Sequence, residues 1–344
     1  MKKPHKLLLG IGALFLLIVV GLCTAYYRFT SQPAFNTSSD KAVRIFVYPD
    51  AQWSDVLDTI AAATDAPLLE DLKLHLGLRA SNAPKVGSYT IEPNMTVQAL
   101  YNRLVHGMQT PISLYFNSYR LPGQLYRRMG SQLMIDSLEV ARAMNDTLLL
   151  RSLNIPDTTL VYYLVPNTYE LYWDITPADL TKRMAEESRK FWNAQRRAEA
   201  DSLGLTPYEV ITLASIVQEE SAKVDEYPMI ARLYINRLRV GMPLQADPTI
   251  KFALQEFGLR RILHKHLKVD SPYNTYIHKG LPIGPIRIPT MEAIDGVLKA
   301  SDHSYLYMCA KEDFSGYHSF ASTYPEHQKN ARKYVAALNE RGIK

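Results

Sequence analysis

An uncharged apolar run near the N-terminus limits what this 344-residue chain can fold into more than any other feature. Leu7–Ala25 is rich in Leu, Ile, Val and Gly and contains no charged residue. Its length matches the roughly 20 residues that a helix needs to cross a bilayer. Lysines at positions 2, 3 and 6 precede the run, and this asymmetry predicts a cytoplasmic N-terminus over residues 1–6. The sequence therefore predicts a transmembrane helix over residues 7–27, with nearly all of the remaining chain outside the inner membrane.

Two other interpretations of this run stay open. A cleavable signal peptide has a similar charged start and apolar core. However, no small-x-small cleavage site follows the run, and Tyr26 and Tyr27 fit an interfacial aromatic belt. Lipid attachment at Cys23 is the second alternative, although Leu22 before it is bulkier than such sites prefer. We expect an uncleaved, single-pass anchor.

The composition of the remaining chain argues against several classes of function. Removing the three N-terminal lysines from the 39 basic residues leaves 36, against 34 acidic ones, so no nucleic-acid-binding surface is expected. The only cysteines, Cys23 and Cys309, lie far apart in the sequence, and the nine histidines are scattered. This pattern predicts neither a disulfide framework nor a metal site, and we expect no cofactor.

Beyond the anchor, the sequence divides into a linker, a small module and a large domain, and the predicted fold class is α+β. Residues 28–42 are rich in Ser, Thr, Pro and Asn, which predicts a linker. Residues 43–110 alternate β-branched and aromatic runs with amphipathic ones, in the order strand, helix, helix, strand, helix. This small α/β arrangement resembles a LysM-like module of the type that binds peptidoglycan. Residues 111–344 predict a larger, mixed α+β domain.

One helix of the large domain places a carboxyl group on an apolar face. The segment Thr206–Glu209 reads Thr-Pro-Tyr-Glu, which predicts a capping box and a helix that runs to Ser221. Residues three and four positions apart share a helix face, so Glu220 lies beside three apolar residues, Leu213, Ile216 and Val217. Glu219 falls on a different face and is expected to be more solvated.

Burial against apolar groups raises the pKa of a carboxyl group because its charged form loses hydration. Glu220 could then hold a proton near neutral pH, as a general acid in glycosidic-bond cleavage must. A structural interpretation also stays open at this point. In it, Glu220 only ends the buried apolar face of the helix, and its side chain points into solvent.

Side chains suited to sugar recognition are frequent around and after this helix. Neutral hydrogen-bonding groups mixed with tyrosines fit a ligand with hydroxyls, acetamides and apolar ring faces. Each of them alone fits a turn or a rim tyrosine equally well. The candidate substrate-binding residues are Ser215, Asn236, Arg237, Gln245, Asp247, Tyr273, Asn274, Thr275 and Tyr276.

Taken together, these segments closely resemble the YceG-like endolytic murein transglycosylases (the MltG family). The resemblance rests on order and spacing, on the layout of anchor, LysM-like module and large domain, and on His318-Ser319-Phe320 near the C-terminus. The motifs that carry it are Leu213–Ser221, Asn236–Leu238, Leu244–Thr249, Tyr273–Tyr276 and Gly280–Pro282.

The resemblance implies a peptidoglycan lytic transglycosylase that acts on nascent glycan strands during cell-wall elongation, with peptidoglycan as its partner and cell-wall synthases as candidate protein partners. It implies a catalytic domain in the periplasm. The family commonly has Glu at the position of Gln218, which cannot donate a carboxyl proton, so the catalytic glutamate maps to Glu220. We expect Glu220 to protonate the bridging oxygen between N-acetylmuramic acid and N-acetylglucosamine. It would then act as base on the muramyl 6-hydroxyl, leaving a 1,6-anhydro end.

Two other functions and two other acids stay open. The chain could be a non-catalytic peptidoglycan-binding scaffold, or a lysozyme-type hydrolase with Asp247 as the second carboxylate. Asp247 is otherwise expected to be a structural or substrate-contact group. Glu226 is expected to be an orienting residue or a helix-surface residue. Ser215 and Ser221 are expected to bond near the acid or to their own helix backbone.

Overall fold

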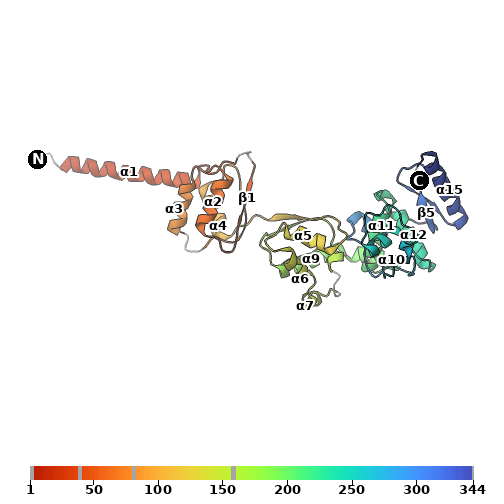
Figure 1. The fold of residues 1–344 in the computed structure, drawn as a ribbon. Helices are drawn as coiled ribbons and strands as arrows, with labels where there is room; N and C mark the ends of the chain where they lie inside the picture. The colour runs from red at the N-terminus through yellow and green to blue at the C-terminus, as the bar shows by residue number, and fades with distance from the viewer. Residues whose placement is uncertain (1–3, 38–40, 80–82, 156–159, 343–344) are drawn as a thin grey trace. The chain divides into compact units, whose positions relative to one another are not determined.

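The computed structural model describes residues 4–37, 41–79, 83–155 and 160–342, and the chain forms two compact units (Figure 1). Unit 1 comprises Met1–Leu114 and Tyr169–Ile175, and unit 2 comprises Tyr115–Thr168 and Thr176–Lys344. Each unit contains helices and short two-stranded sheets, so the fold is mixed α+β as predicted.

The chain begins with the predicted apolar helix. Helix α1 (Pro4–Thr30) contains a stretch, Leu9–Thr30, that is long and apolar enough to cross a membrane. The expectation of a linker from residue 28 is wrong at this point, because α1 continues to Thr30 without a break. Phe29, inside the expected linker, is buried in the core of unit 1, and its ring stacks on His75 at 3.6 Å between ring centroids.

The second half of the expected linker also belongs to unit 1. Ala34 and Phe35 are fully buried, and the Ala34 backbone N–H donates to the carbonyl of Met95 at 2.9 Å. The segment is polar on average, but its few apolar side chains are enough to attach it to the core.

Unit 1 follows the predicted order of strand, helix, helix, strand, helix. Strands β1 and β2 pair antiparallel, from Val43 opposite Ile91 to Val47 opposite Gly87. Helices α2 and α4 pack on this pair and complete the core. The elements after α1 are β1 (Val43–Val47), α2 (Trp53–Ala63), α3 (Leu69–Arg79), β2 (Gly87–Ile91) and α4 (Val97–His106).

A second strand pair brings a distant segment back to unit 1. Strand β3 (Ile112–Tyr115) pairs with β4 (Thr168–Leu171), about 50 residues later in the chain. The amide of Gln109 donates to Asp174 at 2.9 Å, and the hydroxyl of Ser113 donates to Glu170 at 2.7 Å. The sequence predicts the boundary between the small module and the large domain near residue 110. It does not predict that β4 pairs with β3, because this pairing depends on contacts between distant residues.

Unit 2 is mainly helical, with one strand pair near its C-terminus (Figure 1). Its helices are α5 (Pro122–Gly130), α6 (Ser137–Met144), α7 (Thr147–Ser152), α8 (Leu160–Tyr163), α9 (Pro177–Phe191), α10 (Ala194–Leu203), α11 (Pro207–Glu220), α12 (Tyr227–Arg239), α13 (Asp247–Leu254), α14 (Met291–Leu298) and α15 (Tyr324–Glu340). It also contains the 3-10 helices η1 (Val224–Glu226) and η2 (His266–Lys268), and strands β5 (Tyr307–Ala310) and β6 (His318–Ala321).

Helix α11 is the centre of unit 2. Its predicted capping box is confirmed: the hydroxyl of Thr206 accepts from the Glu209 N–H at 3.3 Å, and the Glu209 carboxylate accepts from the Thr206 N–H at 2.8 Å. Helices α8, α10, α12, α13 and α14 surround it. All residues from 210 to 217 are buried, so the expectation of a single apolar stripe is wrong. The middle of the helix is enclosed on every side, and only its first and last turns approach solvent.

Strands β5 and β6 form an antiparallel hairpin, with Tyr307 opposite Ala321 and Ala310 opposite His318. Helix α15 packs against both strands. This register places the first residue of β6, His318, beside the last residue of β5.

Candidate active site

A cavity of about 240 Å³ lies where the C-terminal end of α11 meets α12, the start of α13 and the β5–β6 hairpin. Six of its polar side chains come from four separate segments of the sequence. They are Glu220, Tyr234, Arg237, Gln245, Asp247 and Tyr276. The hairpin closes one side with Met308, Cys309, Ala310 and His318. We call this space the acid cavity.

Glu220 is the last residue of α11 and lines the acid cavity. Burial raises the pKa of its carboxyl group from the ordinary 4.5 to about 7. Asp247 also raises this pKa, whereas the Tyr234 hydrogen bond, His318 and Arg237 lower it by smaller amounts. Glu220 therefore holds a proton in a large fraction of molecules at neutral pH, as a general acid requires. The pKa of Glu220 is raised, as expected from its position. The alternative in which its side chain points into solvent does not match its place in the acid cavity.

Tyr234 and Arg237 lie one turn apart on α12. The hydroxyl of the buried Tyr234 donates to Oε1 of Glu220 at 2.7 Å and so fixes the orientation of the carboxyl group. Arg237 donates from Nε to the carbonyl of Leu306 at 2.6 Å and from Nη1 to that of Leu244 at 2.5 Å. Its guanidinium thus ties the hairpin and the loop before α13 to α12, while one edge faces the cavity.

Asp247 and Tyr276 form the opposite wall. The hydroxyl of Tyr276 donates to Oδ1 of Asp247 at 2.5 Å, and burial together with this bond raises the pKa of Tyr276. Gln245 is exposed and has a left-handed backbone, with φ of 51°. Its N–H donates to the carbonyl of Thr275 at 3.1 Å, which joins the two loops that make this wall.

A third carboxyl group lies outside the lining of the cavity and bonds to His318, which belongs to the lining. Glu226 in η1 is 4% exposed and accepts three hydrogen bonds: from the hydroxyl of Ser221 at 3.0 Å, the His318 backbone N–H at 2.7 Å and His318 Nδ1 at 2.8 Å. Of the two roles expected for Glu226, the geometry fits the orienting residue and contradicts the helix-surface residue. Ser221 bonds to Glu226 rather than to its own helix backbone.

Glu219 lies in a different environment from its neighbour. Its carboxylate accepts from Nε and Nη2 of Arg120 at 2.8 and 2.9 Å and from Nη1 of Arg287 at 2.7 Å. Arg287 also donates to Ser118 at 2.8 Å. The expectation of a solvated Glu219 is wrong, because two guanidinium groups cover it and leave its side chain 14% exposed. We call Ser118, Arg120, Glu219 and Arg287 the arginine cluster.

Gln218 also points away from the acid cavity. Its Oε1 accepts from the backbone N–H of Thr290 at 2.9 Å, at the N-terminal end of α14. Position 218 therefore holds a structural amide in this chain, and Glu220, not residue 218, lines the acid cavity.

Five predicted substrate contacts lie outside the lining of the acid cavity and contact other parts of the protein instead. Ser215 is fully buried, donates to the Thr212 carbonyl and accepts from the Ile286 N–H. Asn236 donates to the carbonyls of His303 and Tyr305.

The other three lie in the loop after η2. Asn274 donates to the carbonyls of Leu267 and Val269, and the hydroxyl of Thr275 accepts from the Ala246 N–H. Tyr273 packs against Phe252, with ring centroids 4.7 Å apart. These residues shape the wall that carries Gln245, Asp247 and Tyr276 without lining the cavity themselves.

Sequence reasoning missed Tyr234 and gave His318 no role. Tyr234 lies fourteen residues after Glu220 on another helix, and its meeting with the acid depends on how α11 and α12 cross. His318 carried a signal, since His318-Ser319-Phe320 was among the segments of the resemblance, but the Glu226 contact spans 92 residues.

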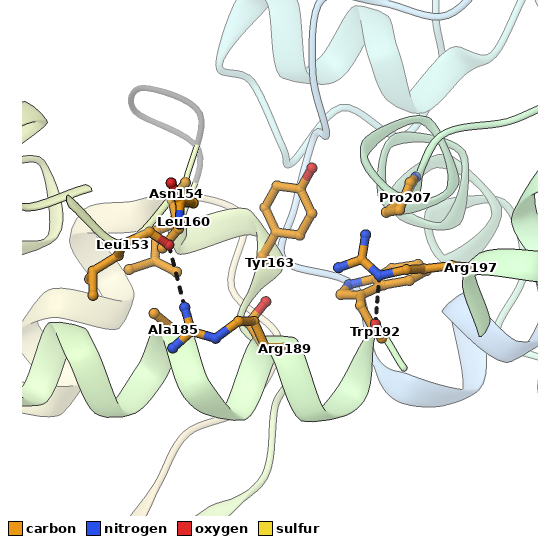
Figure 2. A pocket seen from close by; sticks show the side chains of 11 residues that line it. Leu153, Asn154, Leu160, Tyr163, Ala185, Arg189, Trp192, Arg197 and Pro207 are labelled. Atoms are coloured by element: carbon orange, nitrogen blue, oxygen red, sulfur yellow. Dashed lines mark hydrogen bonds between the residues drawn. The ribbon is translucent and has the colours of Figure 1, made fainter. Parts of the chain in front are cut away.

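Another cavity of unit 2 has no acid among the described residues that line it. It measures about 510 Å³ and is lined by apolar side chains together with Tyr163, Arg189, Trp192 and Arg197 (Figure 2). Arg197 donates to the carbonyl of Trp192 at 2.8 Å, and Arg189 to that of Leu153 at 3.4 Å. No carboxyl group lines this cavity among the residues that the structure describes, so general acid chemistry is assigned to the smaller acid cavity. Within the same described ranges, no group of three or more His, Cys, Asp or Glu residues is arranged to hold a metal ion.

Comparison with known proteins identifies the family. The model of the YceG-like family matches residues 46–333. The chain belongs to the YceG-like family. The predicted resemblance is thereby confirmed.

Two similar curated proteins carry the name endolytic murein transglycosylase. The one from Bacillus subtilis (strain 168) is 34% identical over 180 residues, which is 52% of this chain and 49% of that protein. The one from Streptococcus pneumoniae serotype 2 (strain D39 / NCTC 7466) is 31% identical over 195 residues, 54% of this chain and 35% of that protein. The matches therefore span half or less of the length of these relatives.

The fold is also similar to that of a solved structure, a crystal structure of a yceG-like protein from Listeria monocytogenes. The TM-score is 0.56 at 24% sequence identity, and the match covers 85% of this chain and 99% of the other. At this identity the likeness concerns the fold alone.

Proposed function

We propose that this YceG-like protein is a membrane-anchored endolytic peptidoglycan lytic transglycosylase, a carbon–oxygen lyase that cleaves the β-1,4 bond between N-acetylmuramic acid and N-acetylglucosamine. The observation that carries the proposal is the carboxyl group of Glu220, whose pKa is raised to about 7 in a cavity rich in hydrogen-bonding groups. The names of the relatives from Bacillus subtilis and Streptococcus pneumoniae support the same activity.

In the proposed reaction, Glu220 donates its proton to the bridging oxygen as the bond from that oxygen to the muramyl C1 breaks. The muramyl 6-hydroxyl attacks C1 of its own ring and closes a 1,6-anhydro bridge. Because the attacking hydroxyl is already tethered, the reaction does not require a second carboxylate to activate water. Tyr234 holds Glu220 in place, and Gln245, Asp247, Arg237 and Tyr276 are the residues of the acid cavity proposed to contact the sugar.

A lysozyme-type hydrolase is the second candidate, because Asp247 lines the same cavity as Glu220. In that case Asp247 would serve as nucleophile or activate a water molecule. The hydrogen bond from Tyr276 to Asp247 favours a positioning role for this carboxylate instead.

Product analysis separates these functions. The detergent-solubilised full chain is incubated with purified glycan strands, and the ends are identified by mass spectrometry. We expect 1,6-anhydro-muramyl ends from the wild type and none from Glu220→Gln. Reducing ends would indicate a hydrolase, and the absence of cleavage would favour the non-catalytic scaffold. Products of intermediate length, rather than terminal disaccharides, would support the endolytic mode.

The N-terminal part is proposed to place this activity at its substrate. Helix α1 is long and apolar enough for a single-pass anchor in the inner membrane, with residues 1–6 in the cytoplasm and unit 2 in the periplasm. The β1–α2–α3–β2 part of unit 1 is proposed to be a LysM-like module that binds glycan. Action on nascent strands during elongation, beside cell-wall synthases, would follow from this position. Protease accessibility of unit 2 in spheroplasts tests the orientation.

A further inference from the structure

His318 and Glu226 form a dyad whose carboxylate is buried and whose imidazole faces the acid cavity. Glu226 lies in η1, just after the helix that carries Glu220, and His318 is the first residue of β6. Oε2 of Glu226 accepts from His318 Nδ1 at 2.8 Å and from the hydroxyl of Ser221 at 3.0 Å, while Oε1 accepts from the His318 backbone N–H at 2.7 Å. Ser221 directly follows Glu220, so one carboxylate fixes both the end of the catalytic helix and the histidine.

These contacts determine which nitrogen of the ring faces the sugar. The hydroxyl of Ser221 and the backbone N–H of His318 donate to the two oxygens of Glu226, so this carboxyl group is placed as an acceptor for the His318 ring at 2.8 Å as well. When the ring is neutral and its proton lies on Nδ1 toward Glu226, Nε2 carries a free lone pair. Among the residues that the structure describes, Nε2 has no hydrogen-bond partner, and His318 lines the same cavity as Glu220.

We infer that His318, oriented by Glu226, is the base that takes the proton of the attacking muramyl 6-hydroxyl. This inference rests on the proposed function. It assigns to a second residue the step that the sequence assigned to Glu220. The arrangement is a base that is held by a buried carboxylate and directed at a hydroxyl nucleophile, as in nucleophile–base–carboxylate triads.

The proton balance of the step is closed. Glu220 gives its proton to the bridging oxygen, which leaves as the 4-hydroxyl of N-acetylglucosamine. The bond from C1 to that oxygen breaks, the bond from C1 to O6 forms, and the O6 proton moves to Nε2 of His318. Glu220 is left as a carboxylate and His318 as an imidazolium, and transfer of one proton from His318 to Glu220 through solvent restores both.

The other polar groups of the acid cavity are less suited to accept this proton. The Tyr234 hydroxyl donates to Glu220, and Oδ1 of Asp247 accepts from Tyr276. Arg237 is a permanent donor that binds two carbonyls. A separate base also removes the need for Glu220 to lose and regain its proton within one step.

The test uses the full chain and the rate of formation of anhydro ends. His318→Asn is the central variant, because its amide can still donate to Glu226 while Nε2 is lost. We expect kcat to fall about 10²–10⁴-fold with little change in KM. In His318→Ala, which leaves a space for a ring, added imidazole should restore part of the rate. His264→Ala, at an exposed histidine, is the matched control and should keep the wild-type rate with no response to imidazole.

Glu226→Gln tests the orienting role. Gln would keep the size of the side chain, but its amide has a single acceptor oxygen for the contacts with Ser221, the His318 backbone N–H and the His318 ring, and we expect kcat to fall about 10–100-fold. Imidazole should not rescue this variant, because the ring of His318 is still present.

The inference is overturned if His318→Asn keeps the wild-type kcat, or if folded His318→Ala gains no rate from imidazole. A wild type that forms no anhydro ends would instead overturn the proposed function. The two failures are therefore distinguishable.

Discussion

Glu219 and Glu220 are adjacent on α11, yet they lie in two regions with opposite electrostatics. In the arginine cluster, two guanidinium groups donate three hydrogen bonds to Glu219 and stabilise its charge. In the acid cavity, burial disfavours the charge of Glu220 and raises its pKa to about 7. Successive residues of a helix are rotated by about 100°, so two neighbours can face different surroundings.

The two regions serve different purposes: the arginine cluster stabilises the fold, and the acid cavity carries the proposed chemistry. The ion pairs of Glu219 link the end of α11 to the segments that carry Arg120 and Arg287. Among the described residues no cationic group bonds to Glu220; its hydrogen bond comes from Tyr234, and burial is what keeps its proton available. Substitutions at the two positions should therefore act on different quantities.

The largest expected effect is on catalysis at Glu220. Glu220→Gln removes the transferable proton while it keeps the size of the side chain, and we expect cleavage to slow by about 10²–10⁴-fold or more. The rate of formation of anhydro ends measures this. Glu186→Gln, at an exposed position of α9, is the control and should cleave at the wild-type rate. Full activity of Glu220→Gln would disprove the assignment of the acid.

The same substitution should change stability in a pH-dependent way. The pKa of Glu220 is raised from 4.5 to about 7 on folding, so the folded state binds more protons than the unfolded state between these values. The stability contributed by the protonated group is complete below pH 4.5 and is lost as the pH rises through 7. Wild type should lose roughly 2–3 kcal/mol from this group by pH 8, and Glu220→Gln should not.

Urea denaturation at pH 4.5 and pH 8 measures this effect. Glu220→Gln should be more stable than the wild type at pH 8 and nearly equal to it at pH 4.5. A constant difference between the two proteins at both pH values would contradict a raised pKa.

Loss of charge at Glu219 should have the opposite sign. Glu219→Gln leaves Arg120 and Arg287 without their carboxylate, and we expect the free energy of unfolding to fall by about 2 kcal/mol at pH 7. Trp192 is the tryptophan of unit 2, and its fluorescence follows the unit that contains this cluster. Glu187→Gln, at the more exposed ion pairs of α9, should cost under 1 kcal/mol. If both variants lost the same free energy of unfolding, the arginine cluster would be no more stabilising than the exposed ion pairs of α9.

A smaller effect is expected at Tyr234. Its hydrogen bond lowers the pKa of Glu220, so Tyr234→Phe should raise that pKa further. Activity that needs protonated Glu220 falls as the pH rises above 7, and this alkaline limb should move upward by about one pH unit or less. The pH profile of kcat/KM measures the shift. A downward movement of the limb would mean that Tyr234 supports the proton of Glu220 rather than its charge.

The smallest effect is expected in the cavity of about 510 Å³ that Figure 2 shows. Arg189→Ala combined with Arg197→Ala removes both guanidinium groups shown in Figure 2, without touching the acid cavity. We expect the cleavage rate to stay within about twofold and stability within about 0.5 kcal/mol per exposed site. A large loss of cleavage would show that glycan binding extends to this cavity.

The sequence predicted local features well where neighbours in the chain decide them. The cap at Thr206 and Glu209 and the order of elements over residues 43–106 depend on short-range contacts, and both are found. The polar average of residues 28–42 hid Phe29, Ala34 and Phe35, which unit 1 buries. A local average cannot show which few side chains reach a distant core.

The sequence predicted only part of the site, again because contacts between distant residues decide the rest. The family motifs pointed to Glu220, and four of the nine candidate contacts, Arg237, Gln245, Asp247 and Tyr276, line the acid cavity. The five others contact the protein's own helices and loops, as Ser215 does with the Thr212 carbonyl. Sequence motifs do not separate these two uses.

The sequence by itself determined that the chain has an apolar N-terminal helix, a mixed α+β body and an acid at position 220, since length, periodicity and motifs are properties of neighbouring residues. Only the tertiary structure decided that Glu219 meets two arginines while Glu220 meets Tyr234, and that Glu226 orients His318 toward the cavity. These contacts join segments 14 to 99 residues apart, and a charge is stabilised or disfavoured by what surrounds it in space.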